Sequence, residues 1–158
     1  MMEVRPARPT DIPNILSLIR QKARFDGCLE SLRTKATDIE AAFFSDTPKA
    51  KALLAVKGDQ VFGIATYYDI YSTFIAKPGI WLDDLFVDQN RRKTGAGIAL
   101  MKRLCEIAVA TGCGRIDWIV ATDNRRGRDF YESIGATIFE TVRHSRLDET
   151  AIHQLARS

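Results

Sequence analysis

Apolar positions in the first part of the chain recur at helical spacing after a short extended segment. Residues 4–7 predict an edge strand, and Thr10 is placed to cap the helix that follows. A second, weaker helix is predicted to begin at Thr37 or Asp38. The apolar residues that define the two helices by their i, i+3, i+4 spacing are Ile12, Ile15, Leu16, Ile19, Ile39 and Phe43.

The middle of the chain has the pattern of strands. Two apolar segments, residues 52–56 and 61–68, flank a turn at 57–60 that contains a glycine, which predicts an antiparallel hairpin. A loop is expected at residues 72–79. Residues 80–87 then form a segment apolar enough for a central strand, apart from two adjacent aspartates.

Helices and strands alternate in the last part of the chain. A long helix ends near Gly112, with Ile98, Met101, Leu104, Cys105 and Ala108 predicted on its inner face. The elements expected after it are a strand at 116–120, a short helix at 125–134, a strand at 137–142, a possible strand or turn from 146 and a helix at 151–155. The whole order predicts an α/β class fold with a mixed sheet, and the absence of a linker or repeat predicts a single domain over residues 1–158.

Composition excludes several classes of protein. Hydrophobic residues make up 46% of the chain, but no apolar run has the roughly 20 residues that a membrane helix needs. The first residues do not have the pattern of a secretory signal, so we expect a cytoplasmic protein. The net charge of +3 is too small for a nucleic-acid-binding surface, and the 3 cysteines are expected to be reduced thiols without a metal.

A glycine-rich turn, Arg92-Lys93-Thr94-Gly95-Ala96-Gly97, lies between the predicted central strand and the long helix. Glycines let a ligand approach the backbone, and the first N–H groups of a helix attract anions. The turn is therefore a candidate phosphate site. It matches neither the Walker A nor the dinucleotide-binding pattern, so neither an ATPase nor a dinucleotide enzyme is favoured.

A second motif runs from Asn124 to Ala136. Asn124 is a suitable cap for the short helix, and Tyr131 lies two turns later on a similar face. Without a ligand, Tyr131 could equally be a half-buried aromatic residue, and the neighbouring arginines a solvated face.

Together the two motifs, V-x-x-x-x-R-x-x-G-x-G and N-x-x-x-x-x-F-Y-x-x-x-G-A, resemble the acetyl-CoA signatures of the GNAT N-acetyltransferase superfamily. Within it, the chain is most similar to the diamine and thialysine acetyltransferases. The resemblance implies a mostly antiparallel sheet of six to seven strands with a splayed parallel pair and flanking helices. It also implies acetyl-CoA as the acyl donor and a homodimer.

The resemblance carries over to individual positions. Backbone groups of Leu85, Phe86 and Val87 would contact the pantetheine arm, with Asn124 and Arg128 near its distal end, and Tyr131 would be the general acid that protonates the thiolate. The residues implied at the pyrophosphate are Arg92, Lys93, Thr94, Gly95, Ala96, Gly97 and Ile98.

Carboxylates are the candidate residues for binding the amine that accepts the acetyl group. In the resemblance, Asp83 falls at a carboxylate that holds or deprotonates the substrate amine, and Phe25 and Asp26 match an aromatic–acidic pair that faces it. Departures occur: Asp replaces the usual Glu at positions 83 and 26, and Phe25 replaces Tyr. Alkyl amines are charged at neutral pH, so a carboxylate such as Asp83, with Asp84 beside it, can bind the cation and accept its proton. Strand alternation also allows a plainer interpretation, in which one of the two aspartates simply faces solvent.

Three functions remain open from the sequence. The first is acetylation of a small primary amine, such as a polyamine, a diamine or thialysine, by direct attack on the thioester. The second is acetylation of a protein or peptide amine on the same core. The third is a non-catalytic acyl-CoA sensor, which would need neither Tyr131 nor Asp83.

Overall fold

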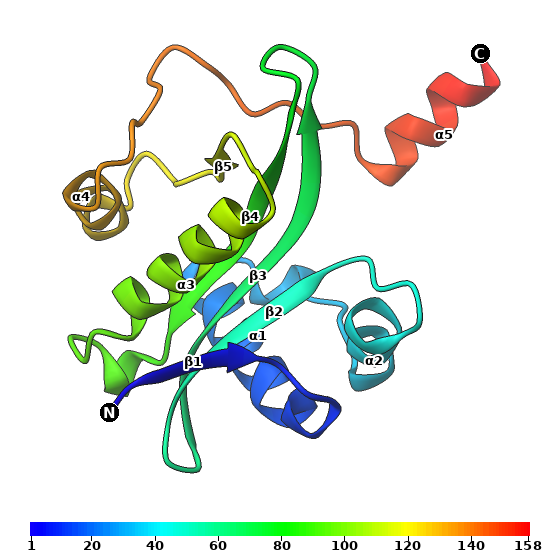
Figure 1. Ribbon diagram of the computed structural model, residues 1–158. Coiled ribbons are helices and arrows are strands. Elements are labelled where there is room, and N and C mark those ends of the chain that lie inside the picture. Colours follow the sequence, from blue (N-terminus) through cyan, green and yellow to red (C-terminus); the bar gives the residue numbers. More distant parts are fainter. The chain divides into compact units, whose positions relative to one another are not determined.

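A five-stranded sheet organises the first of two compact units, Met1–Trp118 and Ile119–Ser158, in the computed structural model, which describes residues 1–158 (Figure 1). The strand order is β1-β2-β3-β4-β5. The first four strands pair antiparallel, and β5 pairs parallel to β4. The strands are β1 (Glu3–Pro6), β2 (Lys51–Lys57), β3 (Gln60–Ser72), β4 (Lys77–Val87) and β5 (Ile116–Asp117). The predicted mixed α/β fold is confirmed, with 5 strands rather than six to seven.

Helices cover both faces of this sheet (Figure 1). On β2, Leu54 packs in one cluster with residues of α1 (Ile12–Phe25) and α2 (Ala36–Phe44). Its neighbours Leu53 and Ala55 point to the opposite face by alternation and are equally buried, on the side of α3 (Ala96–Ala110). β2 is therefore the centre of the core, and its unbroken apolar run reflects burial on both faces.

The inner face of α3 differs in part from the prediction. Met101, Leu104 and Ala108 are buried as expected, together with Leu100. Ile98 is 47% exposed and Cys105 is exposed, so both predictions were wrong. The buried residues Ala96, Leu100, Leu104 and Ala108 are four positions apart, so the face of α3 that contacts the sheet is turned away from Ile98 and Cys105.

The hairpin of β3 and β4 is longer than predicted. Residues expected to be a loop, 72–79, instead continue the two strands to a short turn, with Ser72 opposite Lys77. Tyr71 and Phe74 are exposed at this end, at 64% and 97%. The unbroken apolar runs had indicated a strand only where both of its faces are buried.

The second unit contains α4 (Arg125–Ser133) and α5 (Glu149–Arg157). The short helix predicted at 125–134 is confirmed, and α5 is longer than the predicted 151–155. The strands predicted at 137–142 and from 146 are absent, and the one predicted at 116–120 is limited to Ile116 and Asp117. A strand needs a partner for its N–H and C=O groups, and β5 pairs only with Ile80 and Trp81 of β4.

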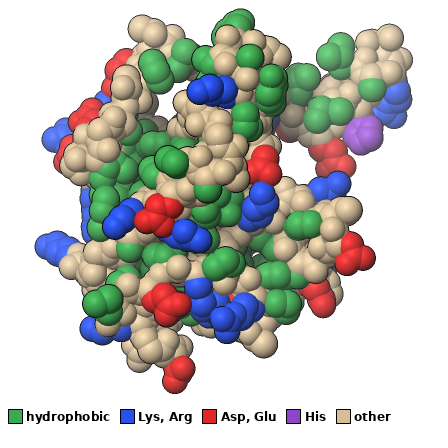
Figure 2. Space-filling view, viewed as in Figure 1, with side chains coloured by type: hydrophobic (Ala, Val, Ile, Leu, Met, Phe, Trp, Pro, Cys, Tyr) green, Lys and Arg blue, Asp and Glu red, His purple; other side chains and the backbone are tan.

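Surface properties agree with a modest net charge. Lys and Arg side chains are interspersed with Asp and Glu on the face shown in Figure 2. No helix combines the length and apolar character needed to cross a bilayer. The three cysteines are free thiols.

A buried carboxylate ties β1 to the entrance of α1. Asp11 is 6% exposed and accepts two hydrogen bonds from the Arg5 guanidinium, at 2.7 and 2.9 Å, and one from Arg8 N at 2.7 Å. Thr10, predicted as the helix cap, lies instead within a 3₁₀ turn, Pro9–Asp11, that precedes α1. Arg5 is the main cause that lowers the pKa of Asp11.

Substituting Asp11→Asn is expected to lower the free energy of unfolding by about 2–4 kcal/mol at pH 7, because it leaves a partly buried Arg5 without its counter-ion. Since the pKa of Asp11 is lowered in the fold, this stabilisation is present above the pKa of an unfolded aspartate, near 3.9, and is lost as pH falls through the folded value. Urea unfolding at pH 7 and pH 3 measures both effects.

Asp38→Asn is the matched control, since Asp38 also accepts a backbone N–H at a helix start, from Lys35 at 2.8 Å, but is exposed. Its loss at pH 7 should be about 1 kcal/mol or less. Equal losses in the two variants would show that the Arg5 ion pair adds nothing to the cap.

Candidate active site

The two adjacent aspartates of β4 lie at a β-bulge. Thr66 of β3 is opposite Asp84, whereas the next residue, Tyr67, is opposite Leu82, so Asp83 is the extra residue on β4. Strict alternation would send the two carboxylates to opposite faces of the sheet. Because the bulge interrupts alternation, both Asp83 and Asp84 line the same cavity.

This cavity has a volume of about 310 Å³ and lies between the sheet and the first two helices. Small-molecule sites generally begin at about 300 Å³. Most of its wall is apolar or aromatic, and the acidic residues come from β4 and the start of α2. Its lining residues are Ile19, Thr34, Asp38, Ile39, Ala42, Phe43, Ala50, Thr66, Tyr67, Tyr68, Asp83 and Asp84.

Asp84 is held in place by two neighbours. Thr66, only 3% exposed, donates its hydroxyl to Asp84 Oδ2 at 2.6 Å. Lys22 Nζ lies 3.6 Å from Asp84 Oδ1 and 2.5 Å from Asp26 Oδ2. Burial disfavours the Lys22 cation, but Asp26 and Asp84 outweigh it and raise the pKa of Lys22 above its usual value. Asp84 therefore already has a cation beside it.

Asp83 has a different environment from Asp84. It takes part in none of the ion pairs of the cavity, although the side chain of Trp81 hydrogen-bonds to it. Its burial, and then the negative charge of Asp84, raise the pKa of Asp83 above that of an ordinary aspartate. A carboxylate with a raised pKa is a better proton acceptor, which suits Asp83 to act as a general base.

The donor side of β4 is an open strand edge. β5 pairs with β4 only at Ile80 and Trp81, so the backbone of Leu85–Val87 has no strand partner on that side. Phe86 is 5% exposed and packs in the core, so it holds this part of β4 in place. This agrees with the splayed parallel pair that the family resemblance implies, and it leaves backbone groups of β4 without a strand partner on that edge.

The glycine-rich turn follows directly and ends in α3. Lys93 and Gly95 both have positive φ, 62° and 85°, and Thr94 Oγ1 donates to Arg91 O at 2.7 Å. Positive φ at alternate residues before a helix can direct backbone N–H groups to one side, as in anion-binding turns. Residues 92–98 therefore form a turn that exposes backbone groups at the start of α3.

Two aromatic rings position Arg92 beside this turn. Its guanidinium lies 5.0 Å from the centre of the Phe25 ring and 5.9 Å from that of Phe86. The two rings are themselves 6.3 Å apart. Phe25 and Asp26, which were predicted at the substrate, do not line the cavity. Phe25 contacts Arg92 of the glycine-rich turn, and Asp26 pairs with Lys22, which also lies near Asp84. The end of α1 therefore lies between the candidate donor and acceptor sites.

The remaining predicted residues lie on α4 in the second unit. Asn124 caps the helix as expected, since its Oδ1 accepts from Gly127 N at 3.0 Å. A Cβ at Gly127 would lie 2.6 Å from Asn124 Nδ2, so this cap requires glycine there. Arg128 pairs with Glu140, and the Tyr131 ring packs 5.4 Å from that of Phe130.

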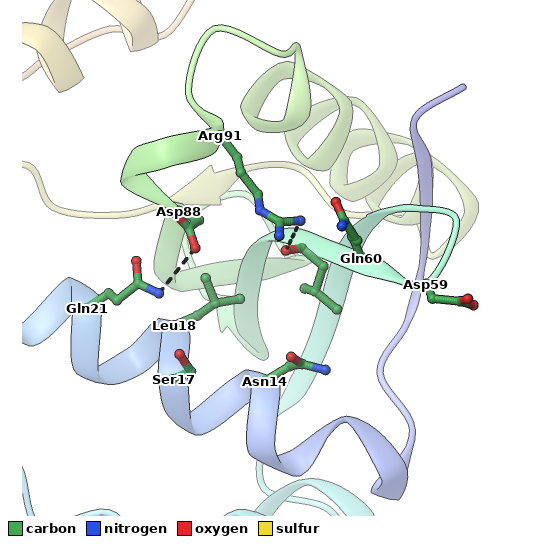
Figure 3. Close-up of a pocket in the computed structure, with 9 residues that line it drawn as sticks. Asn14, Ser17, Leu18, Gln21, Asp59, Gln60, Asp88 and Arg91 are labelled. Carbon is green, nitrogen blue, oxygen red and sulfur yellow. Dashed lines mark hydrogen bonds between the residues drawn. The ribbon is translucent and has the colours of Figure 1, made fainter.

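A second, polar cavity of about 240 Å³ lies beside the start of the donor turn (Figure 3). Gln21 Nε2 donates to Asp88 at 3.4 Å, and Arg91 Nη1 donates to Val61 O at 3.2 Å. Arg91 also lies over the Phe62 ring at 4.7 Å. These contacts bind Arg91 to β3, so it anchors the turn from within the protein.

The sequence reasoning did not identify Thr66, Lys22 or the residues of α2 as parts of the site. Thr66 and Lys22 lie 18 and 62 positions from Asp84, respectively, and no local motif connects them. Ile39 and Phe43 were identified only as apolar helix positions. The one signal in the sequence was the pair Asp83 and Asp84 within an apolar strand, because buried carboxylates need hydrogen-bond or ion-pair partners from elsewhere in the chain.

Comparison with known proteins agrees with this geometry. Residues 15–136 match the model of the acetyltransferase (GNAT) family. A bovine thialysine N-epsilon-acetyltransferase is 30% identical over 141 residues, which cover 84% of this chain and 82% of that protein. The human spermidine/spermine N(1)-acetyltransferase-like protein 1 is 31% identical over 85% of this chain, but the chain spans only about a fifth (20%) of its length.

A solved structure extends the match to the whole fold. An integron cassette protein from V. cholerae superimposes with a TM-score of 0.82 at 26% identity, over 99% of this chain and 98% of that one. The family match covers the bulged strand, the glycine-rich turn and the Asn124–Ala136 motif. The chain therefore belongs to the GNAT acetyltransferase family and is an N-acetyltransferase.

Proposed function

We propose that the protein transfers the acetyl group of acetyl-CoA to the primary amine of a small molecule. The main support for this proposal is the position of Asp83 and Asp84. Both line a cavity of about 310 Å³, and both come directly before the unpaired edge of β4. An acyl donor along Leu85–Val87 would then lie beside the carboxylates that bind the acceptor. A cavity of this size favours a small amine over a peptide segment, which needs an extended groove.

On the donor side, the protein supplies backbone N–H groups and positive charge. The turn at residues 92–98 and the N-terminus of α3 would hold the pyrophosphate, with Arg92 and Lys93 as counter-charges. Asn124 and Arg128 would lie near the pantetheine. A backbone N–H near Leu85 or Phe86 would stabilise the oxyanion that forms when the thioester carbonyl is attacked.

The reaction needs two proton transfers. Asp83 receives the proton of the ammonium, directly or through water, so that the neutral nitrogen can attack the carbonyl carbon. The C–N bond forms and the C–S bond breaks, and Tyr131 gives its phenolic proton to the departing thiolate. Direct attack is favoured because no Cys or Ser that could form an acyl-enzyme lines the cavity.

A thiol-release assay tests this proposal. The protein is mixed with acetyl-CoA and a panel of monoamines, diamines, thialysine, amino acids and short peptides, and free CoA is measured. We expect turnover with at least one small amine. Turnover with peptides alone would favour a protein acetyltransferase, whereas CoA binding without turnover on any amine would favour a sensor. Similar rates with and without amine would indicate hydrolysis and contradict the proposal.

A further inference from the structure

The acceptor cavity has a largely apolar wall and acidic residues from β4 and from the start of α2. Ile39 and Tyr67 are 1% and 5% exposed, so this part of the wall is fixed by the core. Phe43 adds a second ring, and Ile19 and Ala42 complete the apolar surface. Burial raises the pKa of Tyr67, so its phenol is neutral and contributes no charge. A ligand here gains most by placing an apolar group against this wall.

The negative charge at the β4 end of the cavity is compensated in part by one cation, Lys22, which lies 2.5 Å from Asp26 and 3.6 Å from Asp84. Lys22 lies within ion-pair distance of Asp84, and Thr66 donates to the same carboxylate. Asp38 accepts the Lys35 N–H at the start of α2, where the helix dipole already stabilises a negative charge. Of the two acidic residues on β4, Asp83 is the one that takes part in no ion pair, so it is left to bind an incoming ammonium.

A second ammonium on the same ligand would be unfavourable. Beside Asp84 it would compete with the Lys22 cation, and along the apolar wall an unpaired charge would lose its hydration. A ligand with one ammonium and an apolar remainder avoids both costs.

We infer that the acceptor is a primary amine with one positive charge and an apolar body about the size of an aromatic ring, and that Lys22 sets this preference by occupying Asp84. This inference rests on the proposed function and names the acceptor class for the same site. Lys22 acts here through Asp84, as a specificity-determining residue.

The test compares kcat/KM for 2-phenylethylamine, n-butylamine, putrescine and spermidine at saturating acetyl-CoA. The wild-type protein should prefer 2-phenylethylamine to putrescine by about tenfold or more, since misplacing one charged group costs at least as much as one misplaced methylene. Lys22→Met should shift the putrescine to 2-phenylethylamine ratio about tenfold toward putrescine, because Asp84 becomes available to a second ammonium. Lys22→Arg, which keeps the charge, should retain the wild-type ratio.

The apolar wall is tested on α2. Phe43→Ala should lower kcat/KM for 2-phenylethylamine about tenfold and change that for n-butylamine much less. Phe44→Ala is the matched control, because Phe44 packs on the same core cluster from the next position but does not line the cavity. It should leave the ratio of the two substrates unchanged.

The outcomes distinguish failure of the inferred acceptor class from failure of the proposed function. If the wild type acetylates putrescine or spermidine better than 2-phenylethylamine, or if Lys22→Met leaves the ratio unchanged, the acceptor class is wrong while amine acetylation stands. If no amine of the panel releases CoA, the proposed function itself fails and the inference fails with it.

Discussion

Substituting Asp83→Asn is expected to lower kcat for amine acetylation by about 10²–10³-fold, the usual contribution of a general base. Asparagine preserves the size of the side chain and the bulge but cannot accept a proton from the substrate ammonium. Steady-state kinetics with a good acceptor amine measure the loss. A decrease below threefold would rule out Asp83 as the base.

The pH profile distinguishes a base from a merely structural residue. Burial and Asp84 raise the pKa of Asp83, so wild-type kcat should fall on the acid side at a pH above that of an ordinary aspartate, near 3.9. The Asp83→Asn variant should lack this acid limb. The same pKa shift means that ionised Asp83 disfavours the fold above its folded pKa, so the neutral variant should keep or raise the melting temperature at pH 7.

Asp84→Asn is the matched control on the neighbouring residue. Asp84 accepts from Thr66 and pairs with Lys22, so its role is to hold charge beside the base. Its loss should raise KM for the amine more than it lowers kcat. An equal collapse of kcat in both variants would mean that the two carboxylates share the proton and cannot be assigned separate roles.

Substituting Tyr131→Phe is expected to lower kcat by about 10²-fold, because the departing thiolate loses its proton donor. KM for acetyl-CoA should change little, since the ring that packs on Phe130 remains. The measurement is initial-rate kinetics in both substrates. Tyr71→Phe provides the control: Tyr71 is 64% exposed at the far end of the hairpin and lines neither cavity. Unchanged turnover in Tyr131→Phe would remove Tyr131 from the mechanism.

Local motifs of the donor site could be predicted because each needs only neighbouring residues. Positive φ at Gly95 and the cap from Asn124 to Gly127 follow from residue types a few positions apart. The helix and strand order of residues 1–112 was predictable for a similar reason, since periodicity reports which face is buried. At the end of the β3–β4 hairpin only one face of each strand is buried, so the hydrophobic pattern was weaker there. The predicted strands were therefore too short.

Two errors came from assuming ideal periodicity. The inner face of α3 was assigned to Ile98 and Cys105, although Leu100 takes the buried position, because the packing surface of the sheet selects among several apolar residues. The strand predicted at 137–142 does not form, since an alternating pattern gives a propensity but does not provide a pairing partner.

By itself the sequence determined the fold class and the family, because these depend on periodicity and on short motifs whose groups are adjacent along the chain. The tertiary structure decided the acceptor side. A single extra residue in β4 brings Asp83 and Asp84 to one cavity, and Thr66 and Lys22 reach Asp84 from elements distant in sequence. The pKa of Asp83 and the charge left for a substrate are set by distances between these groups, which only packing of the sheet against α1 and α2 establishes.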